Sequence, residues 1–97
     1  MQSERAFRQK TYKEIDTLPN TYRESVQQIA LRGSPDLFLC INGHFVALEY
    51  KRSADAATSE LQRYKQRKIK GAGGKAYMVN PTNWPQVYSI LKSLSNN

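Results

Sequence analysis

The sequence predicts a single α/β domain, residues 1–97, in which a mixed sheet of about four strands is flanked by helices. Three observations lead to this prediction. Segments with helical and with strand-like apolar spacing follow one another in the order αβββαβα. Asn42-Gly43, a strong short hairpin signal, joins two strand-like runs. The chain of 97 residues is long enough for one buried core and too short for two.

The first helix is expected to begin after Ser3, a suitable N-cap, and to run to about Thr17. Pro19-Asn20 ends it, because proline does not continue a helix and asparagine favours turns. The next segment, residues 22–31, is expected to be a strand with imperfect alternation, closed by the Gly-Ser-Pro turn of residues 33–35.

The central hairpin holds the most apolar part of the chain. Residues 37–41 are apolar without interruption, which predicts a central strand covered on both faces and places Cys40 in the core. The turn at Asn42-Gly43 then leads into a return strand over residues 44–52.

Two further helices and a short strand complete the pattern. A helix is expected over residues 58–70, ended by the glycines of residues 71–74, and a strand over residues 76–79. The last helix is expected to begin near Asn83. The residues expected to face the core from these two helices are Leu61, Tyr64, Ile69 and Ala72, and then Trp84, Val87, Tyr88, Leu91 and Leu94.

Charge and composition narrow the class of partner. The chain has 15 Lys and Arg against 8 Asp and Glu, and this formal net charge of +7 favours a polyanionic partner, nucleic acid ahead of an anionic membrane surface. No apolar run approaches the roughly 20 residues of a membrane helix, so no membrane span is expected. The single cysteine cannot form an internal disulfide, and we therefore expect a cytoplasmic protein.

The hairpin geometry predicts a cluster of charged side chains. A turn centred on Asn42-Gly43 places Asp36 opposite Glu49, and opposed residues point to the same side of a sheet with Cβ atoms about 4.5–5.5 Å apart. Lys51, which follows Glu49 with one residue between, lies on that side too, although a bulge would shift this register. Two opposed carboxylates repel each other unless a cation neutralises them. Oxygen ligands without a nearby His or Cys favour Mg²⁺, for which Mn²⁺ can substitute.

These residues also carry a resemblance to a known family. Pro35-Asp36 followed by Glu49-Tyr50-Lys51 resembles the motif of the PD-(D/E)XK nucleases. The surrounding residues are similar to the virus-type replication-repair nuclease (VRR-NUC) family, which is related to Holliday junction resolvases. The similar stretches are residues 33–37, 45–51, 61–62 and 73–77, within a likeness that runs from about Glu4 to Trp84. The resemblance implies a restriction-endonuclease-like core of αβββαβ order.

The resemblance implies a role for each residue of the motif. Asp36 and Glu49 would be ligands of Mg²⁺, with the backbone carbonyl of Tyr50 as a third ligand. Lys51 would be the catalytic lysine, which positions the attacking water or helps to deprotonate it. Gln62 matches a glutamine that the family carries on the helix after the lysine, where it can reach a phosphate or a metal-bound water.

The family also carries an acidic residue on the first helix. Glu4 and Glu14 share one face of that helix, so periodicity does not choose between them. The resemblance favours Glu4 as an additional metal ligand, because the family's acid lies in the first turn. Glu24 is expected on the first strand, and we interpret it as structural even where its side chain faces the site.

The expected function is Mg²⁺-dependent endonuclease cleavage of DNA, selective for branched structures such as Holliday junctions or flaps. Since no sequence-reading element is recognisable and symmetric cutting of a junction needs two active sites, we expect recognition of DNA shape by a C2 homodimer. A non-catalytic basic DNA-binding protein, an exonuclease and an RNA-directed nuclease are the alternatives. The resemblance also suggests a bacterial or phage-encoded protein. The residues expected to contact the DNA backbone are Arg52, Arg63, Lys65, Arg67, Lys68, Lys70 and Lys75.

Overall fold

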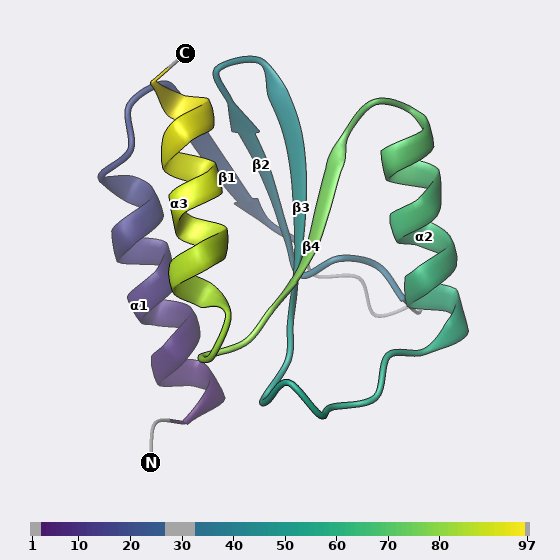
Figure 1. The fold of residues 1–97 in the computed structure, drawn as a ribbon. Helices are drawn as coiled ribbons and strands as arrows, with labels where there is room; N and C mark the ends of the chain where they lie inside the picture. The colour runs from purple at the N-terminus through teal and green to yellow at the C-terminus, as the bar shows by residue number, and fades with distance from the viewer. Residues whose placement is uncertain (1–2, 27–32, 97) are drawn as a thin grey trace.

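The computed structural model describes residues 3–26 and 33–96, and its elements follow the predicted order αβββαβα (Figure 1). The helices are α1 (Glu4–Asp16), α2 (Glu60–Gly71) and α3 (Trp84–Ser95). The strands are β1 (Thr21–Ser25), β2 (Leu37–Ile41), β3 (His44–Tyr50) and β4 (Lys75–Val79). None of the helices in the two described ranges is long and apolar enough to cross a membrane.

α1 begins and ends close to the predicted residues, and β1 begins close to its predicted start. Ser3 caps α1, with its side chain accepting a backbone N–H of the first turn at 3.0 Å, and Thr17 is the C-cap. β1 pairs with β2 as far as Ser25. The predicted strand over residues 22–31 is therefore confirmed in its first part, while positions 27–32 lie outside the described residues.

The four strands form one mixed sheet in the order β1-β2-β3-β4. The first three are antiparallel neighbours, and β4 lies parallel to β3. In the β2–β3 hairpin, which is described throughout, the pairing runs without a bulge from the turn to Leu37 and Leu48. This is the predicted register, but it ends at Leu37 and Leu48: the backbone N–H of Asp36 bonds to Leu48 and not to Glu49, the residue predicted to lie opposite.

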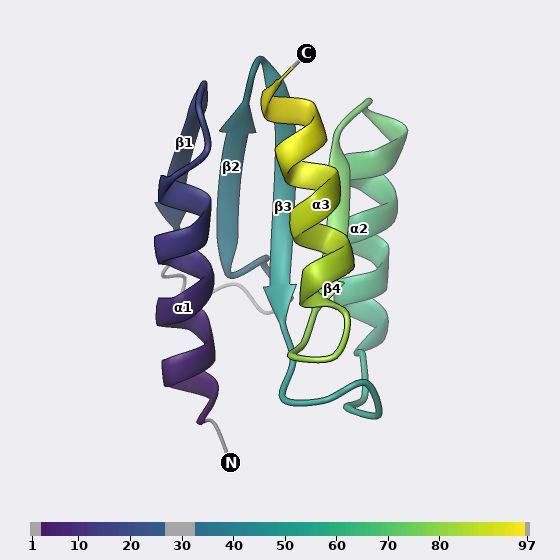
Figure 2. The ribbon, with the colours of Figure 1, turned by 60° about the vertical axis from the view of Figure 1, so that its left-hand side comes forward.

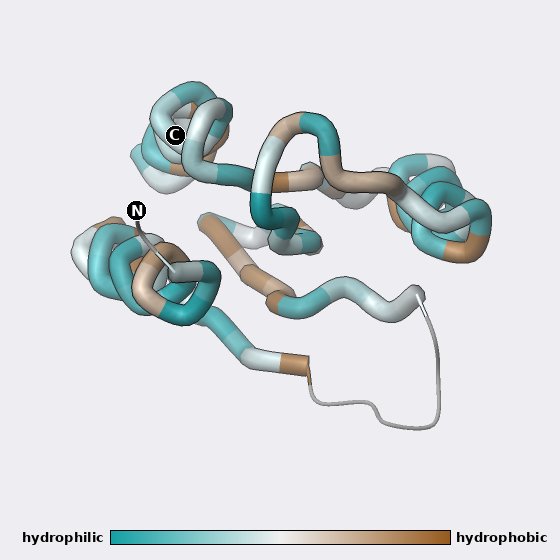
Figure 3. The backbone as a smooth tube through the Cα atoms, turned by 90° about the horizontal axis from the view of Figure 1, so that it is seen from below, coloured by the Kyte–Doolittle hydropathy of each residue, from teal (hydrophilic) through white to brown (hydrophobic). Residues whose placement is uncertain are grey.

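The helices cover the two faces of the sheet unequally (Figures 2 and 3). α1 and α3 lie on one face, and α2 lies on the other, next to β4. The prediction of helices on both faces is confirmed, with two helices on one of them. The core lies between the sheet and the α1–α3 layer, and its most buried side chains are Phe7, Ile15, Leu37, Leu39, Ile41, Val46, Leu48, Val79, Trp84, Val87 and Leu91.

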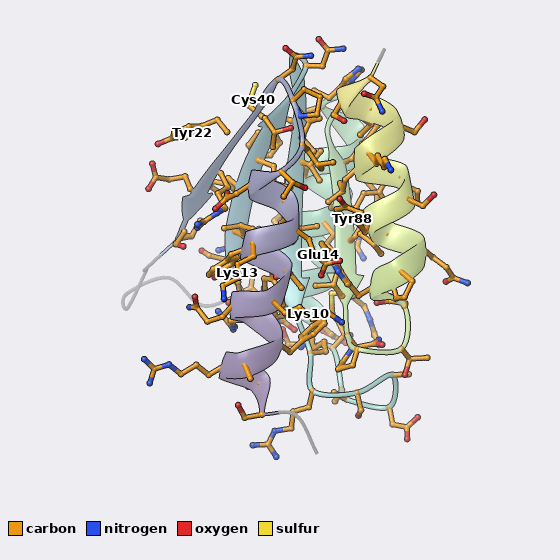
Figure 4. All side chains as sticks on the ribbon, turned by 90° about the vertical axis from the view of Figure 1, so that its left-hand side faces the viewer. Lys10, Lys13, Glu14, Tyr22, Cys40 and Tyr88 are labelled. Carbon is orange, nitrogen blue, oxygen red and sulfur yellow. The ribbon has the colours of Figure 1, made fainter. Side chains whose placement is uncertain are left out.

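The opposite face of the sheet is only partly covered, which corrects the prediction for residues 37–41. β2 is buried on the face toward α1 and α3, but Cys40 points to the other face and is exposed. Because α2 packs beside β4 and does not extend over β1 and β2, Tyr22 and Phe45 are also 64% and 43% exposed. Figure 4 shows Tyr22 and Cys40 at the margin of the sheet, away from the α1–α3 layer.

The orientation of α2 differs from the prediction. None of its residues, all of which the structure describes, is fully buried. Three residues predicted to face the core are exposed, namely Leu61, Tyr64 and Ala72. The half-buried side chains include Gln62 and Lys65 as well as Ile69. The helix is rotated in this way because Gln62 and Lys65 find polar partners beside the sheet.

Candidate active site

The Asp36 carboxylate lies at the open end of the β2–β3 hairpin. Its backbone N–H donates to the carbonyl of Leu48, the residue before Glu49, at 2.9 Å. Its side chain turns along the hairpin, where Oδ2 accepts the backbone N–H of Tyr50 at 2.8 Å. These two hydrogen bonds to β3 hold the Asp36 carboxylate near Glu49, although Asp36 does not pair with Glu49 as the predicted register required.

Glu49, near the end of β3, is the buried member of the carboxylate pair. It is 8% exposed, and its Oε2 has no hydrogen-bond partner among the described residues. Burial raises the pKa of its carboxyl to about 7, aided by the charge of Asp36 and by hydrogen bonding with it, while Lys51 and Arg8 oppose the shift. When Glu49 is protonated, its proton can bridge to Asp36. When it is ionised, two negative carboxylates face each other and Oε2 is left without a donor.

Gln62 connects Glu49 to Lys51. Its Nε2 donates to Glu49 Oε1, while its Oε1 accepts from Lys51 Nζ at 2.9 Å and from the Ser59 backbone N–H at 3.1 Å. Lys51 Nζ also donates to the Ala57 carbonyl at 3.1 Å. Because Oε1 accepts from two donors, the amide presents its nitrogen to Glu49. The hairpin site, as we name it, consists of Asp36, Glu49, Lys51 and Gln62.

The first turn of α2 sets the orientation of Gln62. Ser59 is the N-cap and accepts the Gln62 backbone N–H at 3.1 Å, and the Gln62 side chain returns to the Ser59 N–H, which is a capping box. The Ser-x-x-Gln pattern of residues 59–62 is the signal in the sequence that marks this helix end. The same amide thus closes the helix end and binds Glu49.

Tyr50 points to the opposite face of the sheet and connects the hairpin site to α1. Its hydroxyl lies 2.7 Å from the Thr11 hydroxyl, and its ring packs edge-on against Phe7 with ring centroids 5.9 Å apart. Burial raises the pKa of the Tyr50 hydroxyl above its ordinary value, so this side chain is a neutral anchor. The resemblance implied a role only for the backbone carbonyl of Tyr50.

Arg8 of α1 lies beside Asp36, and no pattern in the sequence indicated that it belongs to the site. Its Nη2 lies 3.5 Å from Asp36 Oδ2 and 3.4 Å from Glu4 Oε1, and its guanidinium carbon lies 4.9 Å from the centroid of the Tyr50 ring. The i, i+4 spacing from Glu4 signals a surface ion pair on a helix. Nothing in that spacing points to Asp36, because the packing of α1 on the sheet brings the two together.

The three acids considered as an additional metal ligand, Glu4, Glu14 and Glu24, have different surroundings in the structure. Glu4 lines an open pocket that also includes Lys51, so it lies beside the hairpin site. Glu14 accepts a hydrogen bond from Trp84 Nε1 at 3.1 Å and is engaged in the packing of α1 on α3, where Figure 4 shows it. Glu24 accepts a hydrogen bond from a tyrosine on the exposed side of β1. Of the three, Glu4 is best placed to assist the site.

The segment before β2 packs against the first turns of α2. Gly33 has a φ of +77°, and a Cβ at this position would lie 2.8 Å from Leu61 Cγ, so both the backbone and the packing require glycine. Lys65 Nζ donates to Ser34 Oγ at 3.2 Å. Between these contacts and Glu49 lies a small cavity of about 10 Å³, close to the size needed for one water molecule.

Three of the residues predicted to contact DNA form a common surface. Arg63, Arg67 and Lys70 are exposed, and their i, i+4 and i+7 spacing places them on one side of α2, which we name the basic face. Arg52 is exposed directly after Lys51. The basic face therefore begins at the residue directly after Gln62 and runs along the helix.

The remaining three do not belong to that surface. Lys65 is half-buried and bound to Ser34. Lys68 is exposed but lies on another side of α2, since its spacing from Leu61 places these two residues together. Lys75 begins β4, and the hairpin site lies at the opposite end of the parallel β3–β4 pair. Lys75, which was predicted to contact DNA, is therefore separated from Lys51 and from the rest of the site.

The donor atoms of the hairpin site suit a small hard cation. Within residues 3–26 and 33–96, no group of three or more His, Cys, Asp or Glu side chains could hold a metal ion. Mg²⁺ needs only one or two carboxylates, because water and substrate phosphate oxygens complete its coordination. The unpartnered Glu49 Oε2 beside Asp36 is an oxygen that such a cation would satisfy. The residues present therefore fit Mg²⁺ or Mn²⁺.

Comparison of the chain with models of known protein families, with curated proteins and with solved structures gives no match. The interpretation of the site therefore rests on its own geometry and on the chemistry of its side chains.

Proposed function

We propose that this protein is a Mg²⁺-dependent nuclease that hydrolyses DNA phosphodiester bonds and prefers branched DNA. One observation carries the proposal: the buried Glu49, with an unpartnered oxygen beside Asp36, lies in a hydrogen-bonded array that leads through Gln62 to Lys51. Two carboxylates and a lysine gathered at the end of a hairpin are the groups that metal-assisted phosphate hydrolysis uses. The net charge of +7 supports a polyanionic substrate.

The residues of the site have distinct roles in this reaction. Asp36, Glu49 and the backbone carbonyl of Tyr50 would hold Mg²⁺, with Glu4 assisting from the adjoining pocket. When bound, Mg²⁺ polarises the scissile phosphate and stabilises the charge of the transition state. Lys51 positions the attacking water or helps to deprotonate it. Gln62 keeps Lys51 and Glu49 in a fixed relative orientation.

The substrate would be held by its backbone. The basic face of α2 and Arg52 offer contacts to phosphates, which carry no base identity. Selectivity would then come from the shape of branched DNA. Each chain supplies one hairpin site, so symmetric cutting of a junction implies a C2 homodimer. Light scattering at micromolar concentration tests this assembly, and a strictly monomeric protein would contradict it.

The test of the activity is cleavage of a labelled four-way junction and of its linear duplex arms, in Mg²⁺ and in EDTA. We expect cutting of the junction in Mg²⁺ and none in EDTA. Lys51→Ala should abolish it, whereas Lys92→Ala, which removes an exposed lysine of α3, should not. Absence of cutting under conditions where the protein binds the junction would refute the nuclease and leave a binding protein.

Two further comparisons define the reaction. A covalently closed circular strand is cut by an endonuclease but gives an exonuclease no end from which to start. RNA of the same sequence tests for an RNA-directed activity. Asp36→Asn removes a negative charge next to the substrate phosphate, so it should lose cutting while it binds the junction at least as tightly as the wild type.

A further inference from the structure

We propose that Arg8 is an exchangeable internal counter-ion of the hairpin site: it balances Asp36 in the metal-free protein and gives way to the divalent cation when that cation binds. This inference rests on the proposed function, because it takes the hairpin site to be a cation site. Arg8 is then a positioning residue, which acts on the site through Asp36 and sets how strongly the site holds its metal.

Among the described residues, Arg8 is the one that forms an ion pair with a carboxylate of the hairpin site. Across residues 3–26 and 33–96, the structure contains ion pairs of Arg8 with Glu4, of Arg8 with Asp36 and of Arg23 with Asp16. Lys51, the other cation nearby, has its Nζ bonded to a backbone carbonyl and to an amide oxygen. The charge of the Asp36 carboxylate is therefore balanced at close range by Arg8.

The contact of Arg8 with Asp36 is loose enough to break. Arg23 binds Asp16 with two nitrogens, at 2.7 and 3.0 Å, in the paired geometry that guanidinium and carboxylate groups favour. Arg8 instead approaches Asp36 with one nitrogen at 3.5 Å and Glu4 with the same nitrogen at 3.4 Å. Its attraction to Asp36 is thus electrostatic, without a fixed set of hydrogen bonds.

Arg8 also makes a contact that does not depend on Asp36. Its guanidinium lies over the Tyr50 ring, with 4.9 Å between the guanidinium carbon and the ring centroid. Tyr50 is itself fixed by the Thr11 hydroxyl and by the Phe7 ring. Arg8 can therefore leave Asp36 and remain over Tyr50 beside Glu4, as a cation over an aromatic face.

Charge repulsion makes the exchange measurable. A divalent cation bound by Asp36 would meet the positive charge of Arg8 within a few ångströms. At about 6 Å in a largely aqueous dielectric, repulsion between a single and a double positive charge corresponds to about a tenfold change in affinity. Removing the charge of Arg8 should therefore strengthen metal binding and, without metal, leave Asp36 and Glu49 unbalanced.

The experiment is a calorimetric titration of the full chain with Mg²⁺ at about pH 8.5, where protonation of Glu49 no longer competes with metal binding. We expect Arg8→Gln to bind Mg²⁺ about tenfold more tightly than the wild type and to melt at a lower temperature in EDTA. The control, Lys10→Gln, removes the same charge from an exposed position of α1 and should change neither quantity (Figure 4).

The outcomes separate this inference from the proposed function. Mg²⁺ binding that is equally strong, or weaker, in Arg8→Gln would overturn the counter-ion role and leave the nuclease standing. No Mg²⁺ binding by the wild type or by Arg8→Gln would overturn both. If Arg8→Gln does not fold, Arg8→Lys keeps the charge, so its Mg²⁺ affinity should stay near the wild-type value. A tenfold gain in Arg8→Lys would then overturn the inference.

Discussion

The Gln62 side chain donates a hydrogen bond to the Glu49 carboxylate from the first turn of α2. The amide oxygen of Gln62 is occupied by the Ser59 backbone N–H and by Lys51 Nζ, so the amide nitrogen faces Glu49. A donor is thereby placed against a buried acceptor whose second oxygen has no partner among the described residues. The properties of the site should therefore depend on an amide, and not an acid, at position 62.

Gln62→Glu tests this dependence with little change in side-chain size. The substitution removes the donor and places a third carboxylate beside Asp36 and Glu49. We expect single-turnover cleavage to fall about 100-fold, and the free energy of unfolding at about pH 8 to fall by about 1–3 kcal/mol. Gln86→Glu, on the exposed side of α3, is the control and should leave both unchanged. Cleavage at the wild-type rate by Gln62→Glu would show that the amide has no such role.

The raised pKa of Glu49 predicts an unusual dependence of stability on pH. The folded pKa of about 7 lies above the ordinary value of 4.5, so between these values the folded state binds more protons than the unfolded state. Without metal, stability should therefore fall as pH rises from about 4.5 through about 7, by up to about 3 kcal/mol. Urea unfolding in EDTA at several pH values measures this.

Glu49→Gln should remove this pH dependence, because the amide does not titrate. It should also abolish Mg²⁺ binding, which in the wild type strengthens as pH rises through about 7 and Glu49 loses its proton. A control at Glu60, an exposed residue of the first turn of α2, should keep the wild-type profile when changed to Gln. An unchanged profile in Glu49→Gln would assign the effect to other groups.

Gly33→Ala should loosen the contact between the segment before β2 and α2. The backbone at Gly33 has a φ of +77°, and the added methyl would lie 2.8 Å from Leu61 Cγ. We expect a loss of about 1–3 kcal/mol in thermal or urea unfolding, together with weaker cleavage, since this segment leads directly into Asp36. Gly71→Ala is the matched control: nothing lies within 4 Å of its added Cβ, and stability should rise by about 0.5–1 kcal/mol. Equal effects at both positions would contradict the packing argument.

The basic face of α2 should dominate the electrostatic part of DNA binding. Changing Arg63, Arg67 and Lys70 together to Gln should weaken binding to every DNA substrate and lower the salt dependence by about 0.9 per lost phosphate contact. Fluorescence anisotropy across a salt series measures both quantities. Lys75→Gln should have little effect on cleavage, since this residue lies at the other end of the sheet from the site.

The control for net charge is the triple change to Gln of Lys10 and Lys13 on α1 (Figure 4) and of Lys92 on α3, all exposed on the helices of the opposite face. It removes the same charge from the protein. If it weakened DNA binding as much as the changes on α2, binding would depend on overall charge and not on the basic face.

What the sequence predicted well depends on short-range geometry. The register that pairs Leu37 with Leu48 follows from a two-residue turn, so the neighbourhood of Asp36 and Glu49 was predictable from local rules. Arg8 was missed because its approach to Asp36 depends on how a helix far away in the chain packs on the sheet.

The rotation of α2 and the exposure of Cys40 both depend on how α2 packs on the sheet. Apolar spacing predicted that Leu61 and Tyr64 face the core, but the helix turns its polar residues inward because Glu49 and Ser34 offer them partners. The position of α2 beside β4 then leaves Cys40 uncovered. Neither outcome is encoded in the periodicity of a single segment, since each depends on which surfaces meet.

α2 is the one helix whose residues, all described, include no fully buried side chain, yet it supplies Gln62 to the site. Asp36 and Glu49 belong instead to the β2–β3 hairpin, whose inner side chains form the core. Elements with few buried contacts open more often than the core that they adjoin. Detachment of α2 alone would thus dissolve the site while the sheet stays folded. Binding of the cation and of DNA would favour the state in which α2 is docked. Amide hydrogen exchange along α2 should therefore be slower with both ligands than without them, which would indicate that the site is completed when the substrate binds.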